Sequence, residues 1–224
     1  MIDTKKVHKL SDIETLSKLP VKLDLVFLKD QFSNYKNPGK KVFDLVQNDF
    51  LFQVQRGHYL NLKSAELKSL SLETLANTLL FPSYVSAEWA LQFYGLLMER
   101  VHTITSVTPQ RAKSYETPLG HFTFEHLKIG RYSLGYGETI SAGKSFWLAR
   151  PEKALVDFIN LRVDEVSWRS ADDIAEFLTE DLRLHIENLL DLVRVENIQE
   201  LLPSYHRNSK EARVLKWLLA QKEA

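Results

Sequence analysis

The stretch at residues 137–145, GETISAGKS, combines glycine, lysine and serine as phosphate-binding loops do. Such a loop needs four residues between its first glycine and the Gly-Lys-Ser/Thr end, so that its backbone N–H groups surround the phosphates. Here five residues separate Gly137 from Gly143, and Glu138 stands where the first glycine is required. The loop must also start a helix, whereas the chain continues as FWLARP, a strand pattern stopped by Pro151. We therefore predict a turn between two strands at Gly143.

The other side chains capable of catalysis do not form a recognisable group. The seven histidines are scattered, and the alternating pattern around His121 and Glu125 predicts a strand. In a strand these two residues lie about 13 Å apart, too far to share a metal ion. The chain contains no G-x-S-x-G, no H-E-x-x-H and no cysteine. We therefore predict no catalytic residues, no metal site and no cofactor, and we expect that the protein is not an enzyme.

A different chemistry is indicated near residues 37–58. Asn37 is followed closely by Lys40 and Lys41, and a later glycine turn carries Arg56 and His58. Basic and amide side chains placed at a helix start and at a hairpin tip are suited to the phosphates of DNA. The same charged residues are also compatible with an ordinary solvated surface. The choice between these interpretations depends on the elements that position the residues.

Three short helices and a hairpin are expected in this region. The first covers residues 11–19, with Ser11 as its cap, Glu14 completing a capping box and Pro20 ending it. Residues 25–32 form a second helix or a strand that leads into a helix.

Asn37 and Pro38 suit the cap and first position of a third helix. Its core face contains Val42, Leu45 and Val46. Residues 51–62 then alternate as a two-stranded hairpin that turns at the glycine after Arg56. This order is typical of a winged helix-turn-helix domain, which we assign to residues 1–66. In that fold the third helix enters the major groove of DNA and the hairpin contacts the backbone.

Composition supports a protein that folds in the cytoplasm. The chain has 224 residues, 44% hydrophobic residues and no cysteine. Its first residues lack the apolar run of a signal peptide, and no apolar window approaches the ~20 residues that span a bilayer. The net charge is zero, but residues 1–63 carry ten Lys and one Arg against seven Asp/Glu. This basic first part is compatible with a polyanionic partner.

Residues 67–224 are predicted to form a second, mixed α/β domain, which makes the whole chain α+β. Its core, about residues 82–162, combines helices with an antiparallel sheet. A helix capped by Ser86 ends at Gly95, and β-branched and alternating segments supply strands between residues 101 and 149. Pro151 opens a further helix. Its core face is expected to contain Ala154, Leu155, Phe158 and Ile159. A helical tail, about residues 170–224, begins with Ser170 as its cap.

Three segments of the second domain resemble the AbiEi-like antitoxin family in their order and spacing. They are YVSAEWALQFYGLL, TITSVTPQRAKSYETPLGHFTFEHLK and RPEKALVDFINL. The hairpin sequence QRGHYLNL also resembles the N-terminal hairpin of that family. The resemblance covers roughly residues 22–162.

The resemblance implies an antitoxin of a type IV abortive-infection system. Such a protein represses its own operon by binding double-stranded operator DNA through its winged helix, as a monomer or a dimer. Its C-terminal domain counteracts a nucleotidyltransferase-like toxin, without necessarily contacting it. Carried onto this chain, the DNA-binding role falls on six residues: Lys36, Asn37, Lys40, Lys41, Gln47 and Arg56. Asp44 lies on the same helix and would repel phosphate.

Two alternative functions remain open. A protein-interaction module built on a winged helix that does not bind DNA would agree with the zero net charge and with Asp44. An enzyme acting on nucleic acid would require a metal-binding carboxylate that the sequence does not nominate. The antitoxin and autorepressor is the function that we expect.

Overall fold

The computed structural model of the chain describes residues 4–141, 143–164, 166 and 168–223 and shows an α+β protein. The chain divides into two compact units. The first comprises Met1–Ser71 with Tyr115–Leu119, and the second comprises Leu72–Ser114 with Gly120–Ala224. Residues 1–3, which belong to the segment in which we expect no signal peptide, lie outside the described residues.

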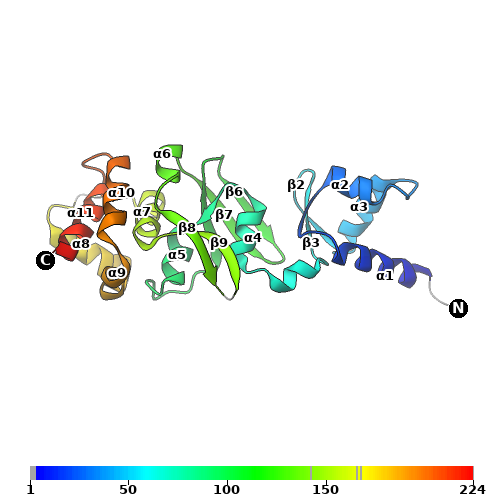
Figure 1. Ribbon diagram of the computed structural model, residues 1–224, viewed down its shortest axis with the longest axis horizontal. Helices are drawn as coiled ribbons and strands as arrows, with labels where there is room; N and C mark the ends of the chain where they lie inside the picture. The colour runs from blue at the N-terminus through cyan, green and yellow to red at the C-terminus, as the bar shows by residue number, and fades with distance from the viewer. Residues whose placement is uncertain (1–3, 142, 165, 167, 224) are drawn as a thin grey trace. The chain divides into compact units, whose positions relative to one another are not determined.

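Within residues 4–71 the first unit contains three α-helices, three strands and a short 3-10 helix (Figure 1). Their order is α1 (Thr4–Ser17), β1 (Lys22–Asp24), α2 (Leu25–Gln31), α3 (Pro38–Gln47), β2 (Leu51–Gln55), β3 (His58–Asn61) and η1 (Ala65–Ser69). The strands form an antiparallel sheet in the order β1-β3-β2. The hairpin β2–β3 turns at Gly57, whose φ is +80°, as predicted. Because β3 is the central strand, it pairs with β1 on one side and with β2 on the other.

The core of this unit lies where the helices meet the sheet. Leu16 of α1, Leu28 of α2 and Leu45 of α3 are at most 2% exposed and belong to one apolar cluster with Leu51 of β2. Asn61, at the end of β3, is fully buried, and its side-chain amide donates to the carbonyl of Leu16 at 2.7 Å. This hydrogen bond ties the end of α1 to the sheet.

The first helix is longer than the sequence predicted. It begins at Thr4 rather than at Ser11, so the predicted cap and capping box at Ser11 are wrong. The carbonyl of Ser11 accepts a hydrogen bond from the hydroxyl of Thr15 inside the helix, and Glu14 pairs with Lys18. A serine that faces solvent is tolerated within a helix, and the capping signal alone therefore gave the wrong start.

The larger sheet of the chain has six strands. They are β4 (Tyr84–Val85), β5 (Thr103–Thr108), β6 (Lys113–Thr117), β7 (Gly120–His126), β8 (Tyr136–Ser141) and β9 (Lys144–Ala149). Their order across the sheet is β6-β7-β5-β4-β9-β8. The turn between β8 and β9 contains Gly143 with φ +73°, which confirms a turn in place of a phosphate-binding loop; residue 142 lies outside the described residues.

This sheet is mixed, so the prediction of an antiparallel sheet was wrong for two strand pairs. The pairs β4–β5 and β8–β9 are antiparallel, whereas β5–β7 and β4–β9 are parallel. The parallel β5–β7 pair arises because β6 takes the outer position and reverses the chain before β7 runs beside β5. Periodicity reveals each strand but not its neighbours, which depend on contacts distant in the sequence.

Helices of the second unit lie against the sheet and form the C-terminal tail. They are α4 (Leu72–Leu79), α5 (Ala87–Phe93), α6 (Ile129–Tyr132), α7 (Pro151–Arg162), α8 (Ala171–Glu176), the π-helix η2 (Phe177–Asp181), α9 (Ile186–Leu192), α10 (Val195–Leu201), the 3-10 helix η3 (Leu202–Ser204) and α11 (Lys210–Glu223). In Figure 1, α7 lies between the sheet and the tail helices. Its opening at Pro151 is confirmed, and so is the cap of α8, where Ser170 and Asp173 form a capping box. Of the expected core face of α7, Phe158 is only half-buried.

Candidate functional site

The start of α3 is fixed by local chemistry. The Oδ1 atom of Asn37 accepts a hydrogen bond from the backbone N–H of Lys40 at 3.0 Å, and Pro38 occupies the first turn. A capping side chain and a proline both favour helix initiation here, because the first N–H groups lack partners within the helix. The predicted cap is therefore confirmed. Its consequence is that Lys40 lies in the first turn of the helix, where the helix dipole is positive.

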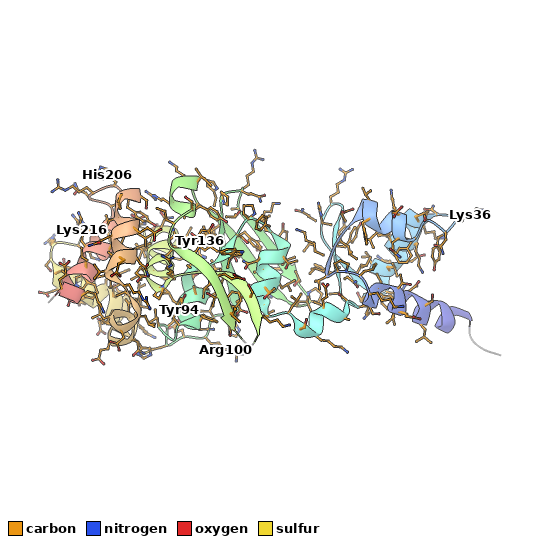
Figure 2. The ribbon with its side chains drawn as sticks, viewed as in Figure 1. Lys36, Tyr94, Arg100, Tyr136, His206 and Lys216 are labelled. Atoms are coloured by element: carbon orange, nitrogen blue, oxygen red, sulfur yellow. The ribbon has the colours of Figure 1, made fainter. Side chains whose placement is uncertain are left out.

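Four of the six predicted DNA-binding residues surround one surface pocket. The pocket measures about 450 Å³, and its lining residues are Tyr35, Lys36, Asn37, Lys40, Lys41 and Asp44. Lys36 and Lys40 are exposed, and Figure 2 shows Lys36 in the loop between α2 and α3. The stem of Lys29, on α2, lies close by: a Cβ atom added to Gly39 would stand 3.7 Å from its Cε. Sequence reasoning missed Lys29, although it is the one basic residue of the short α2.

Lys41 has a different environment from the other lysines. Its ammonium group forms an ion pair with Asp12 of α1, and the two side chains are only 12% and 10% exposed. The ammonium also lies 4.6 Å from the centre of the Tyr35 ring. Lys41 precedes the buried Leu45 by four residues and so shares its side of the helix. The structure therefore gives Lys41 a role in joining α1 to α3, and its DNA contact stays a prediction.

Gln47 and Arg56 lie apart from the pocket. Gln47 is exposed on the last turn of α3, seven residues after Lys40 and on the same helix face. Arg56 is exposed at the tip of the β2–β3 hairpin, beside Gly57. The predicted set thus comprises a cluster at the start of α3, one residue at its end and one at the hairpin tip.

Two further side chains lie on the exposed face of α3. Phe43 is 60% exposed and Asp44 is also exposed, although both belong to a helix whose Val42 and Leu45 are 2% exposed. Sequence reasoning gave Phe43 no role. The sequence signal that could have placed Phe43 on this face was its spacing, three residues after Lys40 and four before Gln47. The face therefore has lysines at its start and an apolar and an acidic side chain in the middle.

The second unit contains a buried polar cluster made from the segments that carry the family resemblance. Asp157 of α7 accepts hydrogen bonds from the Tyr84 hydroxyl at 3.0 Å and from the Ser86 hydroxyl at 2.7 Å. Lys153, one turn earlier, donates to its other carboxylate oxygen at 2.6 Å. Lys153 and Asp157 are 0% and 1% exposed. No substrate can reach these groups from solvent, so the cluster acts within the core.

Burial also determines the ionisation of the tyrosines in this cluster. Burial and the Asp157 carboxylate raise the pKa of Tyr84 well above its usual range. Burial likewise raises the pKa of Tyr205, whose hydroxyl accepts a hydrogen bond from Lys153 at 3.4 Å. Both hydroxyls therefore remain protonated and act as hydrogen-bonding groups.

Comparison with known proteins assigns no family, since no family model matches the chain and no curated protein matches it. Within the described ranges, no helix has both the length and the apolar character needed to cross a membrane. Over the same residues, no group of three or more His, Asp or Glu is arranged to hold a metal ion.

Proposed function

We propose that this protein is a DNA-binding autorepressor and antitoxin of a toxin–antitoxin operon, similar to the AbiEi-like family. The observation that carries the proposal is the first unit: α1-β1-α2-α3-β2-β3 with the sheet order β1-β3-β2. This order supports a winged helix-turn-helix, in which α3 would be the recognition helix and the β2–β3 hairpin the wing. The positive end of α3 and its neighbouring lysines support the same interpretation.

The proposed partner is double-stranded operator DNA. Lys36 and Lys40 contact phosphates beside the start of α3, and Arg56 contacts the backbone from the wing. Asn37 positions the helix, because its side-chain oxygen is already committed to the cap. Gln47 faces base edges from the last turn, where a glutamine can pair with adenine. Lys41 is left out, since its ammonium group is paired with Asp12.

The second unit is proposed to counteract a nucleotidyltransferase-like toxin. Its support is the resemblance together with the Asp157 cluster, which joins the Tyr-Val-Ser and Pro-Glu-Lys-Ala-Leu-Val-Asp segments. We place the protein in the cytoplasm, where its operator and toxin would be found.

Fluorescence anisotropy tests the DNA-binding part. A labelled duplex from just upstream of the gene's own start codon is compared with a scrambled duplex across a range of salt concentrations. The double variant Lys36→Ala/Lys40→Ala removes two phosphate contacts, so the slope of log K against log salt should flatten by about 1.8. Lys128→Ala, an exposed lysine of the second unit, is the control for a lost charge and should leave the slope unchanged.

An unchanged slope in the double variant would refute the phosphate contacts. Equal affinity for the upstream and scrambled duplexes would instead refute the repressor. In that case a protein-interaction module becomes the better function, and the exposed Phe43 and Asp44 on α3 are the observation that favours it. Co-purification of a protein partner that is lost in Phe43→Ala would then support the module.

A further inference from the structure

The middle of α3 presents a large apolar side chain to solvent. Phe43 is 60% exposed, whereas the neighbouring Val42 and Leu45 on the other side of the helix are 2% exposed. Phe43 follows Lys40 by three residues and precedes Gln47 by four, which places the three on one face. A single exposed phenylalanine is not unusual by itself. Its position at the centre of the proposed recognition face is what requires an explanation.

Charge along α3 separates two kinds of surface. Lys36 and Lys40 lie at its start, and Asp44 lies next to Phe43 in the middle. An acidic and an apolar side chain are both unsuited to a phosphate, so the middle of the helix does not face the DNA backbone. Ten residues of helix extend about 15 Å, slightly more than the ~12 Å width of the major groove. When the start of α3 lies against one DNA backbone, the middle of the helix faces the base edges.

The base edges of the major groove carry one apolar group, the C5-methyl of thymine, which phenylalanine side chains contact. We propose that Phe43 reads a thymine by covering this methyl group, so that the DNA site contains a thymine at a fixed position beneath the centre of α3. The proposal rests on the proposed DNA-binding function. It names the chemistry that the site selects, whereas the lysines alone would bind any sequence.

Deoxyuridine substitution tests the contact directly, because deoxyuridine lacks only the methyl group of thymine. Duplexes that bind the full-length protein are first selected from a random 20-bp library. Each thymine of the selected duplex is then replaced singly by deoxyuridine, and affinities are measured by anisotropy for wild type, Phe43→Ala and Lys40→Ala. Loss of one buried methyl group corresponds to about a fourfold loss of affinity for wild type at the contacted thymine.

The interaction between the two substitutions is the decisive quantity. We expect deoxyuridine at that position to leave the affinity of Phe43→Ala unchanged, since the side chain that covered the methyl is already gone. Lys40→Ala binds more weakly overall but keeps the fourfold preference for thymine. The slope of log K against log salt should become shallower in Lys40→Ala and stay unchanged in Phe43→Ala. Because Phe43 is exposed, Phe43→Ala should also unfold at the same urea midpoint as the wild type.

Other outcomes overturn the proposal in distinguishable ways. Selected duplexes whose deoxyuridine profile is the same for wild type and Phe43→Ala would leave DNA binding standing and remove Phe43 as a thymine reader. An identical profile for the two proteins, together with a change from dimer to monomer in sedimentation of Phe43→Ala, would assign the side chain to a contact between two copies. Failure of wild type to bind any duplex would remove the proposed function itself.

Discussion

Replacing Asp157 with asparagine tests how the second unit is held together. The carboxylate binds the Lys153 ammonium at 2.6 Å through one oxygen and the hydroxyls of Ser86 and Tyr84 through the other. Asparagine has nearly the same shape but no charge. It therefore leaves the Lys153 ammonium, which is fully buried, without a counter-charge.

The magnitude follows from the geometry. Two unit charges 2.6 Å apart attract by roughly 6 kcal/mol at an effective dielectric constant of about 20. Most of this attraction offsets the cost of burying the charges, whereas removing one partner of a buried pair costs about 3–5 kcal/mol. A domain is stable by only about 5–15 kcal/mol. Asp157→Asn should therefore remove a large part of the stability of the second unit at 25 °C.

Tryptophan fluorescence gives a selective assay. All four tryptophans belong to the second unit: Trp89, Trp147, Trp168 and Trp217. Urea unfolding monitored by their fluorescence reports this unit alone, and the double variant Lys153→Met/Asp157→Asn is the matched control. Because it contains no unpaired charge, the double variant should be more stable than Asp157→Asn. A loss under about 1 kcal/mol in Asp157→Asn, or a double variant less stable than the single one, would refute the buried pair.

Three further predictions concern local contacts. Lys41→Ala should destabilise the first unit by about 1–3 kcal/mol, because it leaves the largely buried carboxylate of Asp12 without its cation; urea unfolding followed by far-UV circular dichroism measures the loss. Gly135→Ala should be less stable than Gly143→Ala, although both glycines have φ +73°, because only at Gly135 would the new Cβ meet two side chains at 2.9 Å; tryptophan-monitored unfolding compares them. Burial and a neighbouring carboxylate raise the pKa of Tyr94 from 10 to about 12. Its stabilising contribution should be complete below pH 10 and lost as the pH rises towards 12, so Tyr94→Phe should show a shallower alkaline loss in the same fluorescence assay.

Features fixed by short-range chemistry were predictable. The Asn37 cap, the Gly57 turn and the Ser170 cap each depend on residues within a few positions of one another. The role of Lys41 depends instead on where α1 lies, and its partner Asp12 is far away in the sequence. No spacing rule within α3 reveals that partner, although proximity to Leu45 on the helix gives a partial warning.

The burial of α7 was underestimated for a related reason. A helix with one apolar face is expected to show its polar residues to solvent. Because α7 lies between the sheet and the tail helices (Figure 1), Glu152, Lys153 and Asp157 are buried as well. Glu152 accepts hydrogen bonds from the start of α10, and Asp157 accepts them from Tyr84 of β4 and from Ser86 at the start of α5. These partners from other elements are set by the tertiary fold and leave no periodic signal, whereas the Lys153–Asp157 pair has helical spacing.

In the second unit, the residues that carry the resemblance are not the residues proposed to contact DNA. Tyr84, Ser86 and Asp157 are at most 1% exposed and bind one another, so they stabilise the second unit and cannot touch a toxin or DNA. The proposed DNA contacts on α3 are exposed and contribute little to the core. A chain can therefore keep the first set and still bind a different operator, or none. For this reason the function is tested at Lys40 and Phe43, and the fold at Asp157.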